Sequence, residues 1–405
     1  MKYIILIGDG MGDFPYDSLG KKSPLEAAST PNLDYLAREG LLARCQTVPD
    51  GMPPGSDVAI MSLMGYSAKG VLTGRGPLEA LALHIPLKDG DLAFRLNLVT
   101  VDHRGSDTIM LNHAAGDISM VEAKTLLQDL SDQMPLKAGQ SIHQGVNYRN
   151  IFIWPYAPQG LASIPPHDHL DKSIKPFLDD PKLAPIMDLV KASWPILENH
   201  PVNKERIARN QPPANSIWLW GQGTTPVVKT YEERFGLTGA TVSAVDIIRG
   251  LAVATGLKSI DVKGATGDLN TNYQGKTEAG LKALEKYDIS IVHLEAPDEC
   301  SHQGDLKGKL QAIENYDRLI VGPFLKALPD FGDYRLLCSC DHFTPVSLKT
   351  HTPDPVPFVF YDSQKPHKSN GAGYSEKEAI KAGGLIPDGP SLGRLVFGPE
   401  KDGGQ

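Results

Sequence analysis

Four short polar motifs carry side chains that can bind metal ions and support the transfer of a phosphoryl group. In chain order they are Asp9 within Gly-Asp-Gly, Ser56 within Pro-Gly-Ser-Asp, Asp298 and His302 within Asp-Glu-Cys-Ser-His, and Asp341-His342 followed by His351. Carboxylates mixed with imidazoles suit borderline divalent ions such as Mn²⁺ or Zn²⁺, and an oxygen-rich subsite also suits Mg²⁺. Two such ions can activate a hydroxyl and neutralise a phosphoryl group. The four motifs together predict a two-metal phosphoryl-transfer site.

Ser56 is the candidate nucleophile of this site. It lies in a Gly-Ser turn before a helix expected at 57–64, where backbone N–H groups at the helix start can bind a phosphate. A serine hydroxyl is a poor nucleophile unless a neighbour activates it, and a metal ion would supply that activation. Taken alone, a Gly-Ser before a helix is ordinarily only a helix cap. The prediction therefore depends on the motifs occurring together.

Apolar runs that precede the motifs predict the strands that position them. Strands are expected at 3–7, 216–220, 240–244, 289–294, 334–339 and 356–361, with helical periods between them, as at Leu310, Ile313, Ile320 and Phe324. Strands that alternate with helices are typical of a parallel α/β sheet. Such sheets bind ligands beyond the carboxyl ends of their strands, which is where Asp9, Asp298 and Asp341 occur.

Length and composition indicate a globular protein of more than one domain. The chain has 405 residues, of which 41% are hydrophobic and 22% charged. A Pro- and His-rich middle region predicts an inserted smaller domain at 106–204, between the two parts of a metal-binding core at 1–105 and 205–405. The net charge of −8 and the lack of a basic stripe exclude a general nucleic-acid binder.

The sequence also predicts a cytoplasmic protein with no membrane partner. The apolar run that starts at Tyr3 is too short for a secretory signal peptide. No stretch approaches the ~18 to 20 apolar residues of a membrane span. Reduced thiols are expected at all four cysteines, Cys45, Cys300, Cys338 and Cys340.

The motifs resemble those of the alkaline-phosphatase superfamily and, within it, the archaeal-type cofactor-independent (2,3-bisphosphoglycerate-independent) phosphoglycerate mutases. The resemblance runs nearly end to end and is carried by Gly8-Asp-Gly-Met11, Pro54-Gly-Ser-Asp57, Gly74-Arg-Gly-Pro-Leu-Glu-Ala80, Gly264-Ala-Thr-Gly267, Glu295-Ala-Pro-Asp298, Gly304-Asp305 and Asp341-His342. It implies an alkaline-phosphatase-like parallel-sheet core flanked by helices. A smaller α/β cap domain would interrupt this core and close over the substrate.

The resemblance also implies the ligand sets and the reaction. One metal ion would be held by Asp298, His302 and His351, and the other by Asp9, Ser56, Asp341 and His342. The implied cofactors are two divalent ions, Mn²⁺ first, with Mg²⁺ or Zn²⁺ as alternatives. Ser56 would take the phosphoryl group from 3-phosphoglycerate and return it to the other hydroxyl of glycerate, a step of glycolysis. The implied partner is a small phosphorylated metabolite, and the chain would be a monomer or a small homo-oligomer.

Three cations are candidates for holding this substrate. Arg75 in the Gly-Arg-Gly loop is the first candidate for the phosphate group. Arg149 and Lys276 are further candidates, for which surface or ion-pair roles remain open. Bidentate arginines suit phosphate and carboxylate groups.

One segment departs from the archaeal-type pattern. Where those mutases usually have Asp-Arg-Arg-Ala-Gly-Arg, this chain has Asn112-His-Ala-Ala-Gly-Asp117. The segments 165–168 and 214–218 look like a bacterial branch of proposed homoserine kinases, in which His113 and Asp168, with His167 and His169, would contact the acceptor. Such a kinase, in threonine biosynthesis, would use the same metals and Ser56. A phosphatase and a non-catalytic binding protein remain further alternatives.

Overall fold

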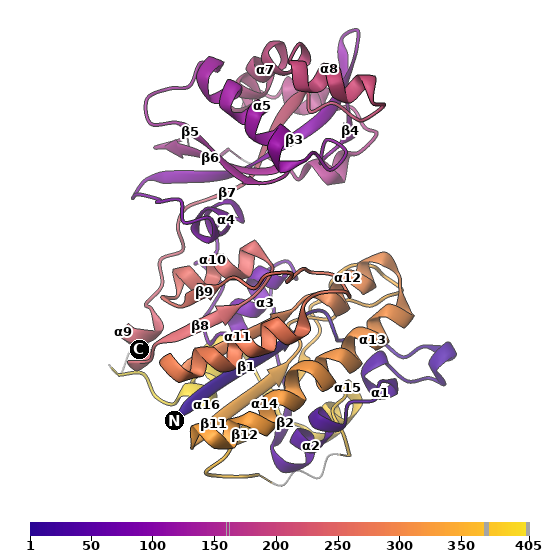
Figure 1. Cartoon of the computed structure of the whole chain (residues 1–405), viewed down its shortest axis with the longest axis vertical. Coiled ribbons are helices and arrows are strands. Elements are labelled where there is room, and N and C mark those ends of the chain that lie inside the picture. The colour runs from indigo at the N-terminus through magenta and orange to yellow at the C-terminus, as the bar shows by residue number, and fades with distance from the viewer. Residues whose placement is uncertain (159, 162, 368–371, 402–405) are drawn as a thin grey trace. The chain divides into compact units, whose positions relative to one another are not determined.

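The chain divides into two compact units (Figure 1). The computed structural model describes all residues except 159, 162, 368–371 and 402–405. Unit 1 comprises 1–72 and 227–405, and unit 2 comprises 73–226. Unit 2 contains the whole of the insertion expected at 106–204 but extends beyond it at both ends. The boundaries differ because strands from both flanks of the expected insertion, β3 (Asp91–Arg104) and β7 (Ser216–Gly223), pair with each other.

Unit 1 is built on an eight-stranded sheet in the order β13-β2-β12-β11-β1-β10-β8-β9. Its strands are β1 (Lys2–Gly8), β2 (Leu41–Cys45), β8 (Gly239–Val242), β9 (Lys258–Ile260), β10 (Ile289–Leu294), β11 (Tyr334–Ser339), β12 (Val356–Asp362) and β13 (Leu385–Ile386). Strands β11, β1, β10, β8 and β9 are parallel neighbours, which confirms the parallel α/β class expected from the sequence.

Strand β12 is an exception to the parallel arrangement. It runs antiparallel to both β11 and β2. A parallel crossover needs a connection of a dozen or more residues that crosses the sheet, usually as a helix. The connection at 340–355 contains no helix. It instead folds as a loop that carries Asp341, His342 and His351.

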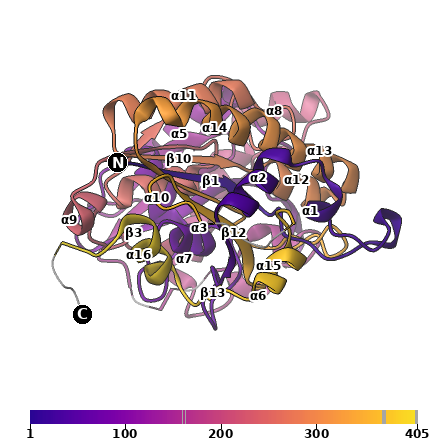
Figure 2. The same cartoon turned by 90° about the horizontal axis from the view of Figure 1, so that it is seen from below.

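Helices cover both faces of the sheet in unit 1. Figure 2 shows α11 (Tyr273–Lys286) and α14 (Gly322–Ala327) on one side of β1 and β10, and α3 (Ser56–Leu63) and α16 (Gly389–Phe397) on the other. Strand β1 is consequently a continuous apolar run, whose Ile4 to Ile7 have no exposed surface. The remaining helices are α1 (Pro24–Ala27), α2 (Pro31–Glu39), α9 (Tyr231–Phe235), α10 (Asp246–Ala254), α12 (Ala296–Gln303), α13 (Leu306–Tyr316) and α15 (Glu376–Ala382).

Unit 2 has an antiparallel sheet in the order β4-β3-β6-β5, with β7 paired to β3. Its further strands are β4 (Asp107–Asn112), β5 (Ser141–Val146) and β6 (Arg149–Pro155), and its helices are α4 (Gly76–Ala82), α5 (Met120–Gln133), α6 (Lys175–Leu178), α7 (Ala184–Glu198) and α8 (Pro201–Ala208). The strand expected at 216–220 in the core is β7 and belongs to this sheet. Phe94, Phe152 and Trp218 lie buried in the hydrophobic core of the unit.

The segment through which the chain enters unit 2 and the segment through which it leaves lie side by side. The Thr73 hydroxyl donates to the Thr224 carbonyl oxygen at 3.1 Å and accepts from the Thr224 N–H at 2.9 Å. Gly74 lies so close to the Gln222 carbonyl that a Cβ atom would collide with it. Glycine is therefore required where the two segments meet.

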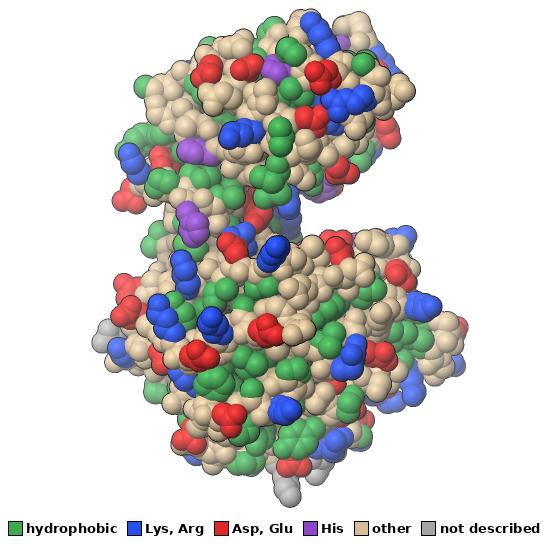
Figure 3. Space-filling model, viewed as in Figure 1, with side chains coloured by type: hydrophobic (Ala, Val, Ile, Leu, Met, Phe, Trp, Pro, Cys, Tyr) green, Lys and Arg blue, Asp and Glu red, His purple; other side chains and the backbone are tan. Residues whose placement is uncertain are grey.

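The surface carries charges of both signs. On the face that Figure 3 shows, Lys and Arg side chains lie among Asp and Glu side chains in both units. None of the helices that the structure describes has the length and apolar character needed to cross a membrane. The four cysteines are free and buried.

Arg206 connects three segments of unit 2. Its side chain is only 2% exposed. The guanidinium donates to the Ala115 carbonyl at 2.6 Å, to the Pro212 carbonyl at 3.0 Å and to Glu122 Oε2 at 2.8 Å. Arg206 is thus a structural residue.

We predict that Arg206→Met destabilises the protein, because it leaves Glu122 and two carbonyl groups without their donor. The free energy of unfolding in denaturant should fall by about 3 kcal/mol. The control is Arg209→Met on the same turn of chain, whose side chain is 55% exposed and pairs with Glu205 at 3.0 Å. Arg209→Met should lower the free energy of unfolding by no more than about 1 kcal/mol. Equal losses in the two variants would contradict the prediction.

Candidate metal and phosphoryl-transfer site

Three neighbouring parallel strands bring the candidate carboxylates together. Strand β1 lies between β10 and β11, so the carboxyl ends of all three meet at one edge of the sheet. Asp9 follows β1 directly, Asp298 lies in the first turn of α12 after β10, and Asp341 comes two residues after β11. Gly10, with φ of 61°, adopts the left-handed conformation and lets the chain approach the Asp298 carboxylate closely.

A first group contains Asp298, His302 and His351. Asp298 and His302 are one helical turn apart, and their Oδ2 and Nε2 atoms are 3.1 Å apart. Nε2 of His351 lies 3.5 Å from Asp298 Oδ1 and 3.0 Å from His302 Nε2. Nδ1 of His302 lies 3.0 Å from the Lys349 carbonyl oxygen, and Nδ1 of His351 lies 3.0 Å from the Pro54 carbonyl oxygen. Such contacts fix the tautomer and leave both Nε2 atoms for a metal ion.

A second group contains Asp9, Asp341 and His342. Nε2 of His342 lies 3.4 Å from Asp9 Oδ1 and 3.2 Å from Asp341 Oδ2. The potential ligand atoms of this group lie within 4.8 Å of one another, and the same holds for Asp298, His342 and His351. His342 therefore contributes to both groups and connects them.

The second group fits a divalent cation. Within the described part of the chain, Asp9 Oδ1 and Asp341 Oδ2 are buried oxygens without a hydrogen-bond donor. A buried carboxylate oxygen without a donor is costly, and a bound cation removes that cost. Burial raises the pKa of Asp9 well above its ordinary value, and the negative charges of Asp341 and Asp298 raise it further. A mixed carboxylate and imidazole donor set suits Mn²⁺ or Zn²⁺.

Ser56 lies beside the residue that joins the two groups. Its Oγ is 3.3 Å from Nε2 of His342. Ser56 is the first residue of α3, a helix whose residues from Val58 to Leu63 are buried. Free N–H groups of a first helical turn can bind phosphate oxygens. All seven candidates for metal binding and catalysis thus come together in unit 1.

His293 is a site residue that the sequence reasoning missed. It has no exposed surface, and its Nε2 lies 2.8 Å from Asp9 Oδ2 while its Nδ1 lies 3.0 Å from the Ser243 hydroxyl. Burial, together with the charge of Lys276, lowers the pKa of His293 to about 3, so the ring is neutral. A histidine within the apolar run Ile-Ser-Ile-Val-His-Leu was the signal that could have identified it.

A buried ion pair supports the loops that carry these ligands. Nζ of Lys309 lies 2.8 Å from Asp13 Oδ2, and neither side chain is exposed. The same ammonium group donates to the carbonyls of Gly12 and Thr344 at 3.3 and 2.9 Å. The Thr344 hydroxyl in turn donates to Asp298 at 2.5 Å. This pair therefore connects the loop after β1 to the loop after β11.

Two of the candidate substrate cations, Arg75 and Arg149, lie near Arg95 in unit 2. The Arg95 guanidinium carbon is 4.2 Å from the centre of the Trp220 ring, and Arg95 Nε pairs with Glu79 at 3.1 Å. Burial lowers the pKa of Arg95. Glu79 raises it, but the charges of Arg75 and Arg149 lower it further. Adjacent cations of this kind favour an anionic ligand.

His113 adjoins the same cluster. Its ring centroid is 5.9 Å from that of His167, which lies 5.5 Å from the Trp220 ring. Burial lowers the pKa of His113 and of His167, and the charge of Arg95 lowers both further.

Arg149 differs from Arg95 in its contacts. Nε of Arg149 is buried and has no hydrogen-bond partner among the described residues.

The last two substrate candidates are Asp168, at the edge of this cluster, and Lys276, in unit 1. The Asp168 side chain is 60% exposed, and its Oδ1 is 3.8 Å from Nε2 of His167. Lys276 belongs to unit 1 and has no exposed surface. Its ammonium group donates to the His293 carbonyl at 3.2 Å, and burial lowers its pKa to about 8.

A serine at a helix start, beside carboxylates and imidazoles at the carboxyl edge of a parallel sheet, defines the class of metal-dependent phosphoryl-transfer enzymes. A family model described as 2,3-bisphosphoglycerate-independent phosphoglycerate mutase matches residues 37–203. A relative from Geobacter sulfurreducens, named probable 2,3-bisphosphoglycerate-independent phosphoglycerate mutase, is 45% identical over 398 residues, covering 98% of this chain and 100% of the relative. The chain belongs to the 2,3-bisphosphoglycerate-independent phosphoglycerate mutase family.

Solved structures similar to this one include two that cover nearly the whole chain. The PH0037 protein from Pyrococcus horikoshii has a TM-score of 0.80 at 27% identity, covering 98% of this chain and 96% of that chain. The cofactor-independent phosphoglycerate mutase from Thermoplasma acidophilum has a TM-score of 0.64 at 26% identity, covering 98% and 99%. The similarity therefore extends over both units of the chain.

We predict that His293 positions Asp9 for metal binding. His293→Phe should weaken Mn²⁺ binding about 10- to 100-fold, because Asp9 loses the partner that orients its carboxylate. His293→Gln, whose amide can donate to Asp9, should recover part of the affinity. Titration calorimetry on chelator-treated protein measures it.

The control for this prediction is a buried histidine of unit 2. His200 is 7% exposed and pairs with Asp129 at 2.8 Å. His200→Gln should leave Mn²⁺ affinity unchanged. If His293→Phe also bound Mn²⁺ with wild-type affinity, His293 would have no role in positioning Asp9.

Proposed function

We propose that the chain is a 2,3-bisphosphoglycerate-independent phosphoglycerate mutase that interconverts 3-phosphoglycerate and 2-phosphoglycerate through a phosphoserine at Ser56. The observation that carries the proposal is the 3.3 Å distance between Ser56 Oγ and His342 Nε2. It places the hydroxyl beside the histidine shared by both groups of potential metal ligands. The family to which the chain belongs supports the same reaction.

Two divalent ions, Mn²⁺ first, would bind at this site. The residues proposed to hold them are Asp298, His302 and His351 for one ion and Asp9, Ser56, Asp341 and His342 for the other. Bound divalent ions lower the pKa of a serine hydroxyl and neutralise the charge of a phosphoryl group. The N–H groups at the start of α3 would bind phosphate oxygens from the side of Ser56.

The proposed reaction has two transfers at one serine. In the first, Ser56 Oγ attacks phosphorus, the bond from phosphorus to O3 of 3-phosphoglycerate breaks, and the serine proton passes to O3 of glycerate. Glycerate then re-orients while it remains bound. In the second transfer, O2 of glycerate attacks the phosphoserine, the bond from phosphorus to Oγ breaks, and the O2 proton passes to Ser56.

The arginine cluster of unit 2 is proposed to hold the anionic groups of the substrate. Arg149 carries the strongest indication, because its buried Nε lacks a partner among the described residues. Arg75 and His113 would assist it, and Asp168 would orient His167. Lys276, which is buried near Asp9, would stabilise the carboxylates of the metal site rather than contact substrate. A guanidinium and a carboxylate form two parallel charge-assisted hydrogen bonds, which are strong and fix the orientation of the carboxylate.

The homoserine kinase alternative shares the metal site and Ser56, and differs only in the acceptor. The functional names among the relatives reported above are those of mutases, so they give this alternative no support. The short segment at 112–117 still lacks the three arginines of the archaeal pattern. Arg95 and Arg149, from the neighbouring strands β3 and β6, supply cations that this segment does not.

We predict that Ser56→Ala lowers the turnover of 3-phosphoglycerate with Mn²⁺ at least about 1,000-fold, because it removes the hydroxyl proposed to accept the phosphoryl group. Formation of 2-phosphoglycerate is followed with enolase. Acid-quenched protein is analysed by mass spectrometry for phosphate on Ser56. The control is Ser62→Ala in the same helix, where the hydroxyl donates to the Val58 carbonyl at 3.3 Å.

Two outcomes would contradict this proposal. Wild-type turnover by Ser56→Ala would exclude the phosphoserine. Phosphorylation of homoserine by ATP in a parallel assay, without mutase turnover, would assign the site to the homoserine kinase alternative.

We predict that Arg149→Met raises the KM for 3-phosphoglycerate about 10- to 100-fold, the equivalent of one charged hydrogen bond. The melting temperature should be nearly unchanged, because the buried Nε of Arg149 has no hydrogen-bond partner among the described residues for the substitution to remove. The matched control is Arg104→Met at the end of β3, whose side chain is 62% exposed. An unchanged KM in Arg149→Met would remove Arg149 from the substrate site.

A further inference from the structure

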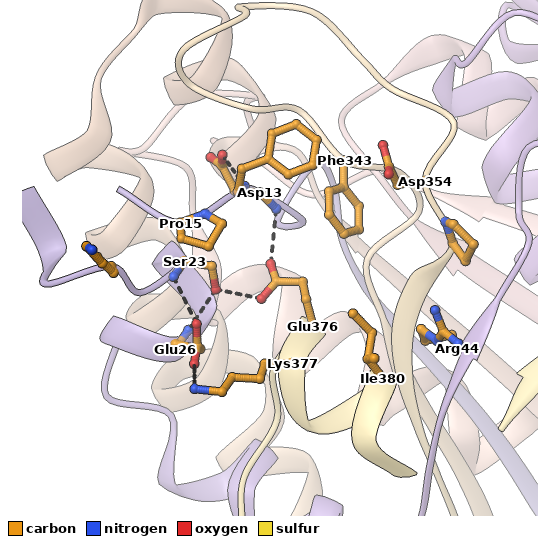
Figure 4. Close-up of a pocket in the computed structure, with 13 residues that line it drawn as sticks. Asp13, Pro15, Ser23, Glu26, Arg44, Phe343, Asp354, Glu376, Lys377 and Ile380 are labelled. Carbon is orange, nitrogen blue, oxygen red and sulfur yellow. Dashed lines mark hydrogen bonds and ion pairs between the residues drawn. The ribbon is translucent and has the colours of Figure 1, made fainter. Parts of the chain in front are cut away.

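Unit 1 contains a cavity of about 470 Å³ that the proposed reaction does not use. Five segments line it: the loop after β1, the helix α1, the strand β2, the loop after β11 and the helix α15 (Figure 4). Its size lies within the range of small-molecule sites. The chemistry of its walls indicates which ligand it would take.

The acidic wall of the cavity is internally paired. The Glu376 carboxylate accepts from the Asp13 N–H at 3.0 Å and from the Ser23 hydroxyl at 2.6 Å (Figure 4). Glu26 accepts from the Ser23 N–H at 3.2 Å and pairs with Lys377 at 3.4 Å. These carboxylates therefore have partners within the protein itself.

Arg44 lies on the opposite wall from Ser23 and Glu26 (Figure 4). Its Nε is buried, and among the residues that the structure describes it has no hydrogen-bond partner. Arg234 of the same unit, by contrast, pairs with Glu400 at 2.7 Å. A buried guanidinium nitrogen without an acceptor is costly. Arg44 also lines the cavity, so the terminal nitrogens of its guanidinium would pair with an anionic ligand there in bidentate geometry.

Apolar side chains form the wall between these charged groups. Figure 4 shows Phe343 and Ile380 between Arg44 and Ser23. The Phe343 ring is 6% exposed and lies 5.9 Å, centre to centre, from the Phe14 ring. Ile380 is 58% exposed at the rim. A ligand held by Arg44 would bury its apolar part on these side chains.

The balance of charge distinguishes a carboxylate from a phosphate. The lining contains four acidic and three basic side chains, so a doubly charged phosphate would be repelled by more carboxylates than it could pair with. A single negative charge needs only Arg44. The ligand expected from the lining is a singly charged anion with an apolar body.

We propose that this cavity binds a small organic monocarboxylate with an aromatic or branched apolar group, its carboxylate on Arg44 and its apolar group on Phe343 and Ile380. The site is separate from the metal-binding side chains, although Phe343 directly follows His342. Binding here does not depend on the proposed mutase reaction, and it is measured without turnover.

The probe is 3-phenylpropionate, with 3-phenylpropanamide as its uncharged counterpart. Titration calorimetry and ligand-observed NMR on the full chain should show saturable binding of the carboxylate and at least about tenfold weaker binding of the amide. Arg44→Gln should weaken carboxylate binding about tenfold and leave amide binding unchanged. Arg44→Lys keeps the positive charge but cannot form the bidentate pair, so its affinity for the carboxylate should lie between those of the wild type and Arg44→Gln.

Ile380→Glu is a second variant, at an exposed position where the fold is not at risk. It places a negative charge at the rim and should weaken the carboxylate at least about tenfold, with an unchanged melting temperature. The absence of saturable binding to the wild-type chain would overturn the proposal. So would carboxylate binding of equal strength in the wild type, Arg44→Gln and Ile380→Glu, because the probe would then bind elsewhere.

Discussion

The convergence of buried carboxylates at one edge of the parallel sheet is the constraint on which the site depends. Asp9, Asp298 and Asp341 leave three adjacent strands at the same end, so their negative charges are forced together where water is excluded. A protein tolerates this only if cations or donors compensate the charge. Histidines and the Thr344 hydroxyl provide part of the compensation, yet one oxygen of Asp9 and one of Asp341 remain without a donor in the described structure.

Much of this site was predictable because strand ends are visible in the sequence. The apolar runs before Asp9, Asp298 and Asp341 predicted that the three residues share an edge, and the structure brings them together. His293 was not predicted, because a histidine inside a strand has no partner that sequence spacing reveals. The unit 2 cluster was partly missed for the same reason. Arg95 approaches Arg149 and Trp220 only through strand pairing, which depends on contacts distant in sequence.

The class of the fold followed from alternating strand and helix patterns, whereas strand order and direction did not. Local periodicity predicted a strand at 356–361, but its antiparallel direction results from the helix-free loop that precedes it. The sequence predicted a domain boundary at 204 because the composition changes there. Strand β7 instead belongs with β3, and no local property of residues 216–223 indicates which of two sheets will receive them. Pairing partners are a tertiary property, so periodicity alone cannot supply them.

The hydrogen-bonded contact between Thr73 and Thr224 bears on how the chain can be engineered. Because the segment from 73 to 226 begins and ends at the same place, it can in principle be removed or exchanged without moving the ends that it joins. A short linker in its place would leave the eight-stranded sheet and all seven candidate metal-binding and catalytic residues in one continuous polypeptide. An exchange of unit 2 would therefore alter the arginine cluster and leave the candidate metal site unchanged.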